Sequence, residues 1–459
     1  MNVNTEARRA PRPERPKSRD RRFPPRSLLL LAACLTVSIG CVEDEQPSDR
    51  LHVVLVTIDT LRADRLGIHG YERDTSPALD RFFESGTAFT RATSTTPCTI
   101  PSMQQLLTGR LVDHVDSPTL AQMLRAHGYQ TAAIVSQHQF RHGRLTWFDR
   151  GFDSFDIQGL RELDRHGLST RAAAEVTDRA LTWLGEERGA GPFFLWLHYF
   201  DPHDPYWPPA AERRFVERAA SPHRGDRRVL GQELAGESRL RRRYPRFEAA
   251  DAERFADLYD EEVAYTDAQL GRLFEHLEQL GLVDESIVIV TSDHGERLGE
   301  DGMWDHCKTL RPPEMHVPLL VRVAGEPLAA GPRDDSITST LDVVPTLVAL
   351  LGLERRGDET AVLDGEDLRS VPSGRRVIAS WNGWQSIREG DWSLYRRGDS
   401  LDLYRVRTDP REREDLADVE PATTTRLRAE LDESRALTEP GESQSRETIE
   451  QLEALGYIE

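Results

Sequence analysis

Two aspartates, a histidine and a threonine carry the most specific chemical signal in this sequence of 459 residues. Asp59 directly follows one apolar run, and Asp293 with His294 directly follows another. Thr99 precedes Ile-Pro-Ser, in a turn at the predicted start of a helix, where free backbone N–H groups favour an anion. Brought together, these four side chains would bind one divalent cation. The cation would lower the pKa of the Thr99 hydroxyl and make it a nucleophile.

Two other motifs supply hydrogen-bonding and cationic side chains. Residues 198–203 read His-Tyr-Phe-Asp-Pro-His, and residues 305–308 read Asp-His-Cys-Lys. We expect four of these groups to hold a tetrahedral anion and its leaving oxygen, because donors and positive charge stabilise both. They are His198, His203, His306 and Lys308. Lys308 is the only lysine beyond Lys17 in a chain that otherwise uses arginine, which favours a functional role.

Each of these residues also has a purely structural alternative. Asp59 and Asp293 could cap helices, and Thr99 could be only a helix N-cap. His198 ends a buried strand, so it could be a structural residue beneath the site as readily as a substrate contact.

Apolar β-branched runs alternate with amphipathic segments through residue 353. Buried strands are predicted at 52–58, 131–135, 192–198 and 286–291, and helices at 77–84, 102–108, 119–127 and 259–280. This alternation predicts an α/β fold whose large, mostly parallel mixed sheet lies between layers of helices. In such sheets ligands bind beyond the carboxyl ends of the strands, which is where Asp59, His198 and Asp293 stand.

Beyond residue 353 short strand candidates follow one another between Gly-Asp turns. They lie at 376–380, 386–388, 392–395 and 401–404, and a Glu/Arg-rich helical tail begins near residue 410. This pattern predicts a small C-terminal antiparallel sheet with a helix. We therefore expect a catalytic domain at 51–370, with a surface insertion at 209–250, and a C-terminal subdomain at 371–459.

The first forty residues have the composition of an export signal. Residues 1–26 carry eight Arg and one Lys against three acidic residues, a net charge of +6, and residues 27–40 are uncharged. This apolar run suits a signal-peptide core better than a membrane span. It ends at Cys41, as in a bacterial lipoprotein signal, with Cys34 as a weaker candidate. We predict a signal peptide at 1–40, lipidation of Cys41, and a linker at 41–50. The protein would then be exported to the cell envelope, in the periplasm or on the outer surface, and anchored by lipid.

The overall composition excludes several classes of protein. A formal charge of −19 argues against nucleic acid as a partner, and four cysteines are too few for a disulfide scaffold. Hydrophobic residues make up 38% of the chain, which is enough for a large core. We expect contact with a membrane only through the N-terminal lipid anchor.

Nine stretches of sequence, taken in order, resemble the sulfatase family of the alkaline-phosphatase superfamily. They cover roughly residues 51–418 and include IDTLRADRLGIHGY, WLHYFDPHDPY and IVIVTSDHGERLGE. The resemblance implies a metal-dependent hydrolase of sulfate or phosphate esters, with a glycan, a lipid head group or an aryl group as the other half of the ester. It implies metal ligation by Asp59, Asp293, His294 and the nucleophile. It further implies substrate contacts from His203, His306 and Lys308.

The chain departs from the family pattern at the nucleophile. The family has Cys or Ser, any residue, Pro, Ser and Arg, and the first residue is oxidised to formylglycine. Alignment on Pro101 and Ser102 puts Thr99 at the oxidised position and Met103 in place of the arginine. Oxidation of a secondary alcohol gives a ketone, so Thr99 cannot form formylglycine. Cys98 is one residue early, and we predict that it stays unconverted.

Further departures widen the choice of activity. A family lysine expected after Gly128-Tyr129 is missing, because residues 135–138 read Val-Ser-Gln-His. A threonine nucleophile with an Asp-His pair is what phosphoethanolamine transferases and lipoteichoic acid synthases of the superfamily use. The leading alternative is therefore a transferase that moves a phosphoryl-linked head group onto envelope lipids or glycans. A second alternative is a non-catalytic glycan- or lipid-binding descendant.

Two chemical questions stay open on the sequence. The nitrogen ligand of His294 shifts the expected cation toward zinc or manganese, with calcium as the sulfatase alternative. Cys98 and Cys307 flank the predicted site from separate motifs, and in an oxidising compartment they could pair.

Overall fold

A computed structural model describes most of residues 50–434. Outside the description lie 1–49, 112–116, 141–146, 161–169, 205, 207, 210–213, 216–248, 326, 329–335, 354–362, 373 and 435–459. The predicted signal peptide, Cys41, nearly all of the linker, most of the insertion and the end of the tail therefore fall outside the described residues. None of the described helices is long and apolar enough to cross a membrane.

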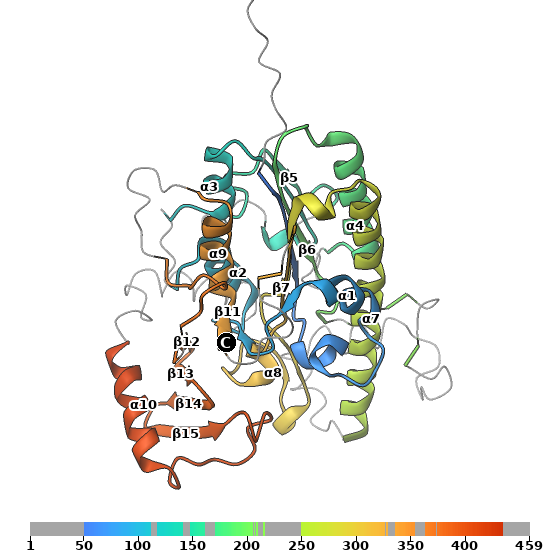
Figure 1. Cartoon of the computed structure of the whole chain (residues 1–459). Helices are drawn as coiled ribbons and strands as arrows, with labels where there is room; N and C mark the ends of the chain where they lie inside the picture. The colour runs from blue at the N-terminus through green and yellow to red at the C-terminus, as the bar shows by residue number, and fades with distance from the viewer. Residues whose placement is uncertain are drawn as a thin grey trace, which may run out of the picture. The chain divides into compact units, whose positions relative to one another are not determined.

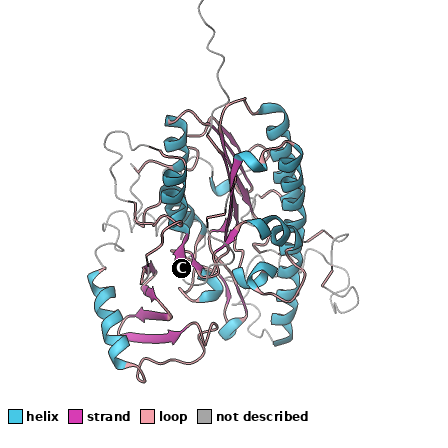
Figure 2. Cartoon of the chain, in the orientation of Figure 1, coloured by secondary structure: helices cyan, strands magenta, loops and turns pink. Residues whose placement is uncertain are grey.

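Seven strands form the central sheet, in the order β2-β10-β7-β1-β6-β4-β5 (Figures 1 and 2). The strands are β1 (His52–Ile58), β2 (Thr87–Ala88), β4 (Gln130–Val135), β5 (Ser154–Asp156), β6 (Phe193–Tyr199), β7 (Ser286–Ser292) and β10 (Leu319–Val323). β1 pairs in parallel with β6 and β7, whereas β10 runs antiparallel to β7. The predicted mostly parallel mixed sheet is confirmed.

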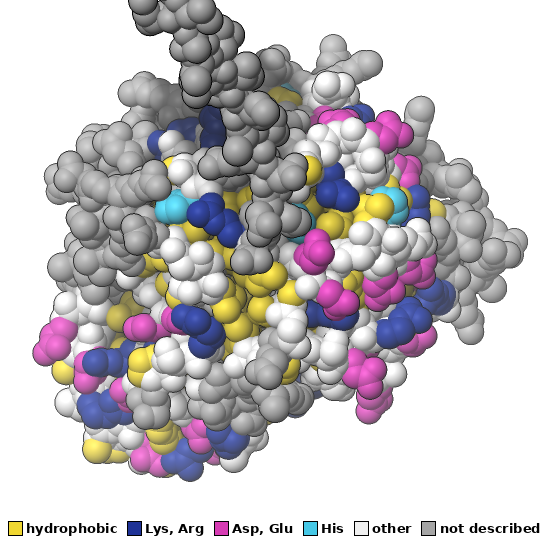
Figure 3. Space-filling model, turned by 45° about the horizontal axis from the view of Figure 1, so that its top comes forward, with side chains coloured by type: hydrophobic (Ala, Val, Ile, Leu, Met, Phe, Trp, Pro, Cys, Tyr) yellow, Lys and Arg dark blue, Asp and Glu magenta, His cyan; other side chains and the backbone are white. Residues whose placement is uncertain are grey.

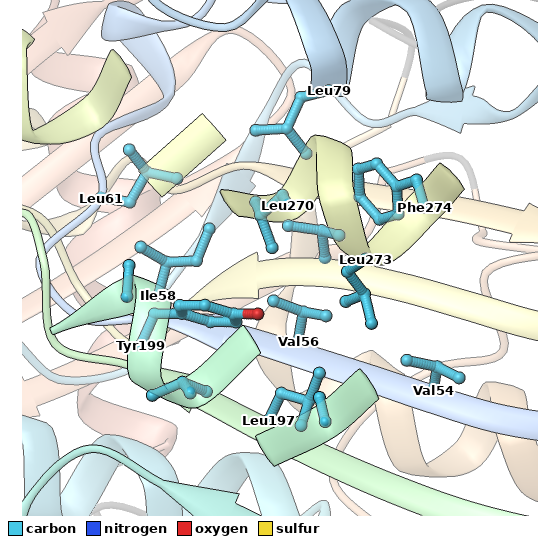
Figure 4. Packing of buried hydrophobic residues seen from close by; sticks show 14 of the residues in the cluster. Val54, Val56, Ile58, Leu61, Leu79, Leu197, Tyr199, Leu270, Leu273 and Phe274 are labelled. Atoms are coloured by element: carbon cyan, nitrogen blue, oxygen red, sulfur yellow. The ribbon is translucent and has the colours of Figure 1, made fainter. Parts of the chain in front are cut away.

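Helices cover both faces of this sheet (Figure 1). One layer holds α1 (Pro77–Phe82), α4 (Ala173–Thr182) and α7 (Ala249–Gln279), and the other holds α2 (Thr99–Thr108), α3 (Leu120–Ala126) and α9 (Val343–Leu350). On the first face Val54 and Val56 pack with Leu270 and Phe274, as Figure 4 shows. Alternate residues of β1, such as Leu55, pack on the second face. Burial on both faces explains why the strands are continuous apolar runs.

Two helices begin earlier than their sequence predicts. α2 starts at Thr99 because Cys98 has extended backbone angles, and Pro101 is tolerated in the first turn, where its missing N–H is not needed. α7 starts at Ala249, ten residues before the predicted boundary, because Phe255 and Leu258 extend its buried stripe. The Arg-rich sequence before Phe255 and Leu258 made the helical spacing of these residues hard to recognise in the sequence.

The predicted C-terminal antiparallel sheet with its helix is confirmed. It consists of β12 (Arg376–Trp381), β13 (Trp384–Glu389), β14 (Trp392–Arg397) and β15 (Ser400–Arg405), with α10 (Pro421–Glu433) beside it. Tyr395 and Tyr404 of this sheet pack against Leu310 and Met315, in the segment that follows Lys308. The sheet therefore supports one of the predicted site loops.

Short elements complete the described structure. β3 (Ala92–Thr93) pairs with β11 (Thr338–Ser339), β8 (Arg297–Leu298) pairs with β9 (Trp304–Asp305), and α8 is Pro312–Met315. On the face shown in Figure 3, acidic and basic side chains are interspersed among the described residues.

Candidate active site

The carboxyl ends of β1, β6 and β7 lie side by side and gather three of the predicted site residues. In the register of the sheet, Thr57 is paired with His198, and Ile58 is paired with Ser292. Asp59 and Asp293 are the next residues after β1 and β7, and the structure leaves both side chains without solvent exposure. Parallel pairing thus brings together residues more than 200 positions apart in the sequence.

His294 presents one ring nitrogen to this cluster. Its Nδ1 lies 2.9 Å from the carbonyl oxygen of Gly295, which can only accept, so Nδ1 carries the proton. Its Nε2 then has a free electron pair, and it lies 3.1 Å from Thr99 Oγ1, 3.4 Å from Asp293 Oδ2 and 3.9 Å from Asp59 Oδ1. A backbone carbonyl that fixes the tautomer in this way is typical of a metal-binding histidine.

Two carboxylate oxygens in the cluster are buried without a hydrogen-bond donor. They are Asp59 Oδ1 and Asp293 Oδ2, and neither accepts a hydrogen bond from the described residues. A buried, unpaired carboxylate oxygen is costly unless a cation neutralises it. One ligand atom from each of Asp59, Asp293 and His294 lies within 4.8 Å of the others. These residues therefore fit one divalent cation, as the sequence predicts.

Thr99 stands at the first position of α2, and its helix is fastened directly to the Asp293 loop. The Ser102 hydroxyl, one turn along α2, donates to the carbonyl oxygen of Asp293 at 2.6 Å. Ser94 donates to the same carbonyl and lies 3.0 Å from the Ser102 oxygen. This buried serine pair holds Thr99 beside His294.

Burial and the charge of Asp293 raise the pKa of Asp59 from 3.8 to about 8. Between these two pKa values, Asp59 of the folded, metal-free protein thus holds a proton that the unfolded chain releases. We expect the free energy of unfolding of the metal-free protein to fall as the pH rises from about 4 to about 8. Urea denaturation with a chelator present, at pH values across this window, measures the effect.

Two controls belong to this pH experiment. Asp59→Asn should flatten the pH dependence, and a saturating cation should reduce it, because the ion neutralises the carboxylate at every pH. A free energy of unfolding that rises between pH 5 and pH 8 in the metal-free protein would contradict the raised pKa of Asp59, because that pKa predicts a fall from about pH 4 to about pH 8.

His198 and Gln137 lie beneath the carboxylate of Asp59. The Gln137 amide donates to Asp59 Oδ2, and His198 Nε2 lies 3.7 Å from the same oxygen. His198 Nδ1 is 2.8 Å from Thr57 Oγ1, which also accepts from Trp196. Burial lowers the pKa of His198 to about 4, so its ring is neutral. This setting favours the structural alternative for His198.

His306 is held by two carboxylates. Its Nδ1 lies 3.1 Å from both Glu296 Oε1 and Asp305 Oδ1. Tyr206 donates to the other oxygen of Glu296 at 2.9 Å. Burial raises the pKa of Glu296 to about 7. Because the imidazole nitrogen lies between two acceptors, Nδ1 carries a proton, and this trio forms a hydrogen-bonded support for the ring.

Three predicted histidines are in ring contact. The His306 ring centre lies 4.6 Å from that of His294 and 4.8 Å from that of His203. The Lys308 ammonium contacts the Trp304 carbonyl and lies 3.3 Å from Asp305 Oδ2, so it joins the site through the carboxylate beneath His306. The structure thus brings His203 and His306 together with His294, whereas Lys308 is linked to His306 through Asp305.

Cys98 and Cys307, whose pairing the sequence left open, form a disulfide. Gln137 and Glu296 are the two site residues that the sequence did not single out. Each had a detectable signal: Gln137 follows the carboxyl end of β4 by two residues, and Glu296 follows β7 within the Asp-His motif.

The sequence and the fold of this chain are similar to those of known proteins. The sequence model of the family Sulfatase matches residues 52–353. An ulvan-active sulfatase of Formosa agariphila is 24% identical over 362 residues, which cover 72% of this chain and 67% of that protein. An N-acetylglucosamine-6-O-sulfatase of Bacteroides thetaiotaomicron is 22% identical, with 84% and 86% covered. The solved phosphonate monoester hydrolase of Agrobacterium radiobacter has a TM-score of 0.64 at 21% identity, with 85% and 96% covered.

The fold and the site are those of a hydrolase of the alkaline-phosphatase superfamily. Within that class, the chain belongs to the sulfatase family, as its motifs indicated. It is thus a sulfatase-like ester hydrolase. Family members use a divalent metal, and Asp59, Asp293 and His294 form a ligand cluster suited to one. The roles of the individual site residues stay predictions.

Proposed function

We propose that this enzyme hydrolyses phosphate or sulfate esters with Thr99 as its nucleophile. The observation that supports this most directly is the 3.1 Å contact between Thr99 Oγ1 and His294 Nε2, at the buried carboxylate cluster. Cys98 is engaged in a disulfide, so its sulfur is not free for conversion to formylglycine. Thr99 is then the only hydroxyl at the family's nucleophile position.

One divalent cation, zinc or manganese by our proposal, would be held by Asp59, Thr99, Asp293 and His294. When bound, it supplies positive charge that lowers the pKa of the Thr99 hydroxyl and polarises the ester. The N-terminus of helix α2, where Thr99 stands, adds the positive end of the helix dipole to the charge of the cation. His306 and His203 provide donors for the anion's remaining oxygens.

The reaction then proceeds in two steps. The Thr99 hydroxyl releases its proton to solvent water, Thr99 Oγ1 forms a bond to phosphorus or sulfur, and the bond to the leaving oxygen breaks. That oxygen takes the Nε2 proton of His306, which enters this step with a proton on each ring nitrogen. Water next attacks the phosphorylated or sulfated threonine and gives one proton to His306 Nε2, which restores that ring. The bond from Thr99 Oγ1 breaks, the inorganic product leaves, and Thr99 Oγ1 takes up a proton from solvent. An alcohol in place of water would give the transferase, which is the second candidate because of the threonine nucleophile and the Asp-His pair.

The anion pocket is poor in fixed positive charge. Met103, which replaces the family arginine, is fully buried, and the neutral Gln137 amide lies at Asp59 near the expected lysine position. A formylglycine hydrate can expel sulfate through its second hydroxyl, but Thr99 has none, so its ester must be displaced. A phosphate ester of Thr99 undergoes such a displacement more readily than a sulfate ester does. A singly charged phosphodiester therefore suits this site best.

We expect phosphodiesters to be hydrolysed with a higher kcat/KM than aryl sulfates. Matched nitrophenyl phosphodiester, phosphate monoester and sulfate substrates, each assayed with zinc, manganese and calcium, measure this preference. A sulfate preference above about 100-fold, or about 2.7 kcal/mol in barrier height, would refute it. Product analysis with added alcohol separates the transferase from the hydrolase. A protein that binds metal but turns over none of these esters would favour the non-catalytic descendant.

A glycan ester is the natural substrate class to test next. The ulvan-active and N-acetylglucosamine-6-O-sulfatase relatives are both named for carbohydrate substrates.

We further propose that the enzyme works outside the cytoplasm, held by lipid on Cys41. The signal-like composition of residues 1–40 supports this location, and palmitate labelling of wild type against Cys41→Ala tests it.

A further inference from the structure

The disulfide joins the two segments that carry the proposed chemistry. Cys98 directly precedes Thr99, and Cys307 stands between His306 and Lys308. The two Cα atoms lie 4.9 Å apart, although 209 positions separate them in the sequence. Both residues are buried, with exposed fractions of 0% and 4%. A covalent bond therefore links the nucleophile's backbone to the loop of the predicted substrate-binding residues.

We propose that Cys98 and Cys307 are positioning residues, whose disulfide fixes His306 relative to Thr99. This inference rests on the proposed function, in which Thr99 attacks and His306 donates a proton to the leaving oxygen. Neither sulfur touches the substrate or takes part in bond exchange. Cys98 acts through the backbone of Thr99, which follows it, and Cys307 acts through the backbone of His306, which precedes it.

The loop that carries His306 needs such a restraint. Asp305 and Cys307 both have left-handed backbone angles, with φ of 71° and 62°, which non-glycine residues adopt at an energetic cost. Such a conformation persists only when its surroundings hold it. Two hydrogen bonds assist the disulfide: the Cys307 N–H donates to the Pro97 carbonyl at 2.9 Å, and Trp381 Nε1 donates to the Cys307 carbonyl at 2.7 Å.

The residues that hold the metal depend less on this bond. Asp59, Asp293 and His294 follow β1 and β7, which are the central strands of the sheet, and the serine pair fastens Asp293 to α2. Loss of the disulfide should therefore leave the cation in place while His306 moves relative to Thr99. Small displacements of this kind lower catalytic rates strongly, because proton transfer needs hydrogen-bond distances.

The decisive experiment compares Cys98→Ala, Cys307→Ala and the double variant. Each single variant removes the same bond, so all three should lose kcat by a similar factor of about 10 to 100, rather than by multiplied factors. Bound metal should stay at one ion per chain. A dithiol such as dithiothreitol, which gives two electrons and two protons to the bond and becomes a cyclic disulfide, should lower wild-type kcat to the same level. It should not affect the double variant.

A matched control separates positioning from general stabilisation. Leu431→Ala removes a buried side chain of α10 in the C-terminal cluster, so it should lower the melting temperature but leave kcat unchanged. Full activity in Cys307→Ala would overturn the proposal. So would a far larger loss in Cys98→Ala than in Cys307→Ala, because Cys98 would then act on its own.

A measurement without turnover keeps this test separate from the proposed function. Hydrogen exchange of the amides at 305–309 should become faster in Cys307→Ala than in wild type or Leu431→Ala, whatever the substrate. If wild type hydrolyses no ester but this exchange changes as expected, the proposed function fails while the restraint on the loop stands. Unchanged exchange at 305–309 would overturn the restraint itself.

Discussion

Thr99→Ala should lower kcat/KM by about 1,000-fold or more, which corresponds to at least about 4 kcal/mol of lost transition-state stabilisation. The variant keeps the helix but removes the oxygen that forms the covalent intermediate in the proposed mechanism. Thr99→Val should lose as much, since it keeps the side-chain volume of threonine without the hydroxyl. Thr99→Ser should keep activity within about 10-fold of wild type, because a hydroxyl remains beside His294.

Peptide mass spectrometry decides the same assignment independently of activity. The peptide from Thr93 to Arg110 should carry unmodified Thr99, and without reduction it should be linked through Cys98 to the peptide that contains Cys307. An aldehyde at Cys98 would restore an ordinary sulfatase mechanism. A Thr99→Ala enzyme with more than about a tenth of the wild-type kcat/KM would equally refute the nucleophile.

His294→Ala should abolish stoichiometric metal binding and, with it, turnover. We expect one zinc or manganese ion per wild-type chain, because a nitrogen ligand joins the oxygen atoms of Asp59 and Asp293. Metal at 100 times its dissociation constant adds about 2.7 kcal/mol to the free energy of unfolding. A chelator should therefore lower the melting temperature of wild type, whereas His294→Ala should show no such change.

His127→Ala is a matched control for this metal experiment. His127 follows α3, and its Nδ1 bonds to the carbonyl of Met123, so the variant also loses an imidazole. It should keep the metal, the chelator effect and the activity. Elemental analysis and calorimetric titration measure metal binding in wild type and in both variants. Stoichiometric calcium without any transition metal would contradict the expected identity of the ion.

The sequence predicted the fold well because its signals are local. The continuous apolar runs of β1, β6 and β7 indicate strands buried on both faces, and their alternation with helices requires a largely parallel sheet. From that topology alone, Asp59 and Asp293 could be placed at one edge. Boundaries were predicted less well: Ala249 begins α7 within a stretch whose charge obscured its helical spacing.

The interactions around each functional group were decided only by the tertiary structure. The sequence could name His306 but not the contact of its Nδ1 with Glu296, which reaches it from a different loop. Likewise the place of Gln137 just after a predicted strand could be read from the sequence, but its contact with Asp59 arises only because β4 lies two strands away from β1. Such contacts join residues distant in the chain, and no local pattern encodes them.

By itself, then, the sequence determined the residue types of the site, the order of strands and helices, and the family, because each depends on composition and spacing along the chain. The tertiary structure decided which nitrogen of His294 faces Thr99, which carboxylate oxygens stay unpaired, and that Cys98 pairs with Cys307. These properties depend on distances of a few ångströms between segments up to 209 positions apart, and only packing of the sheet and its loops sets such distances.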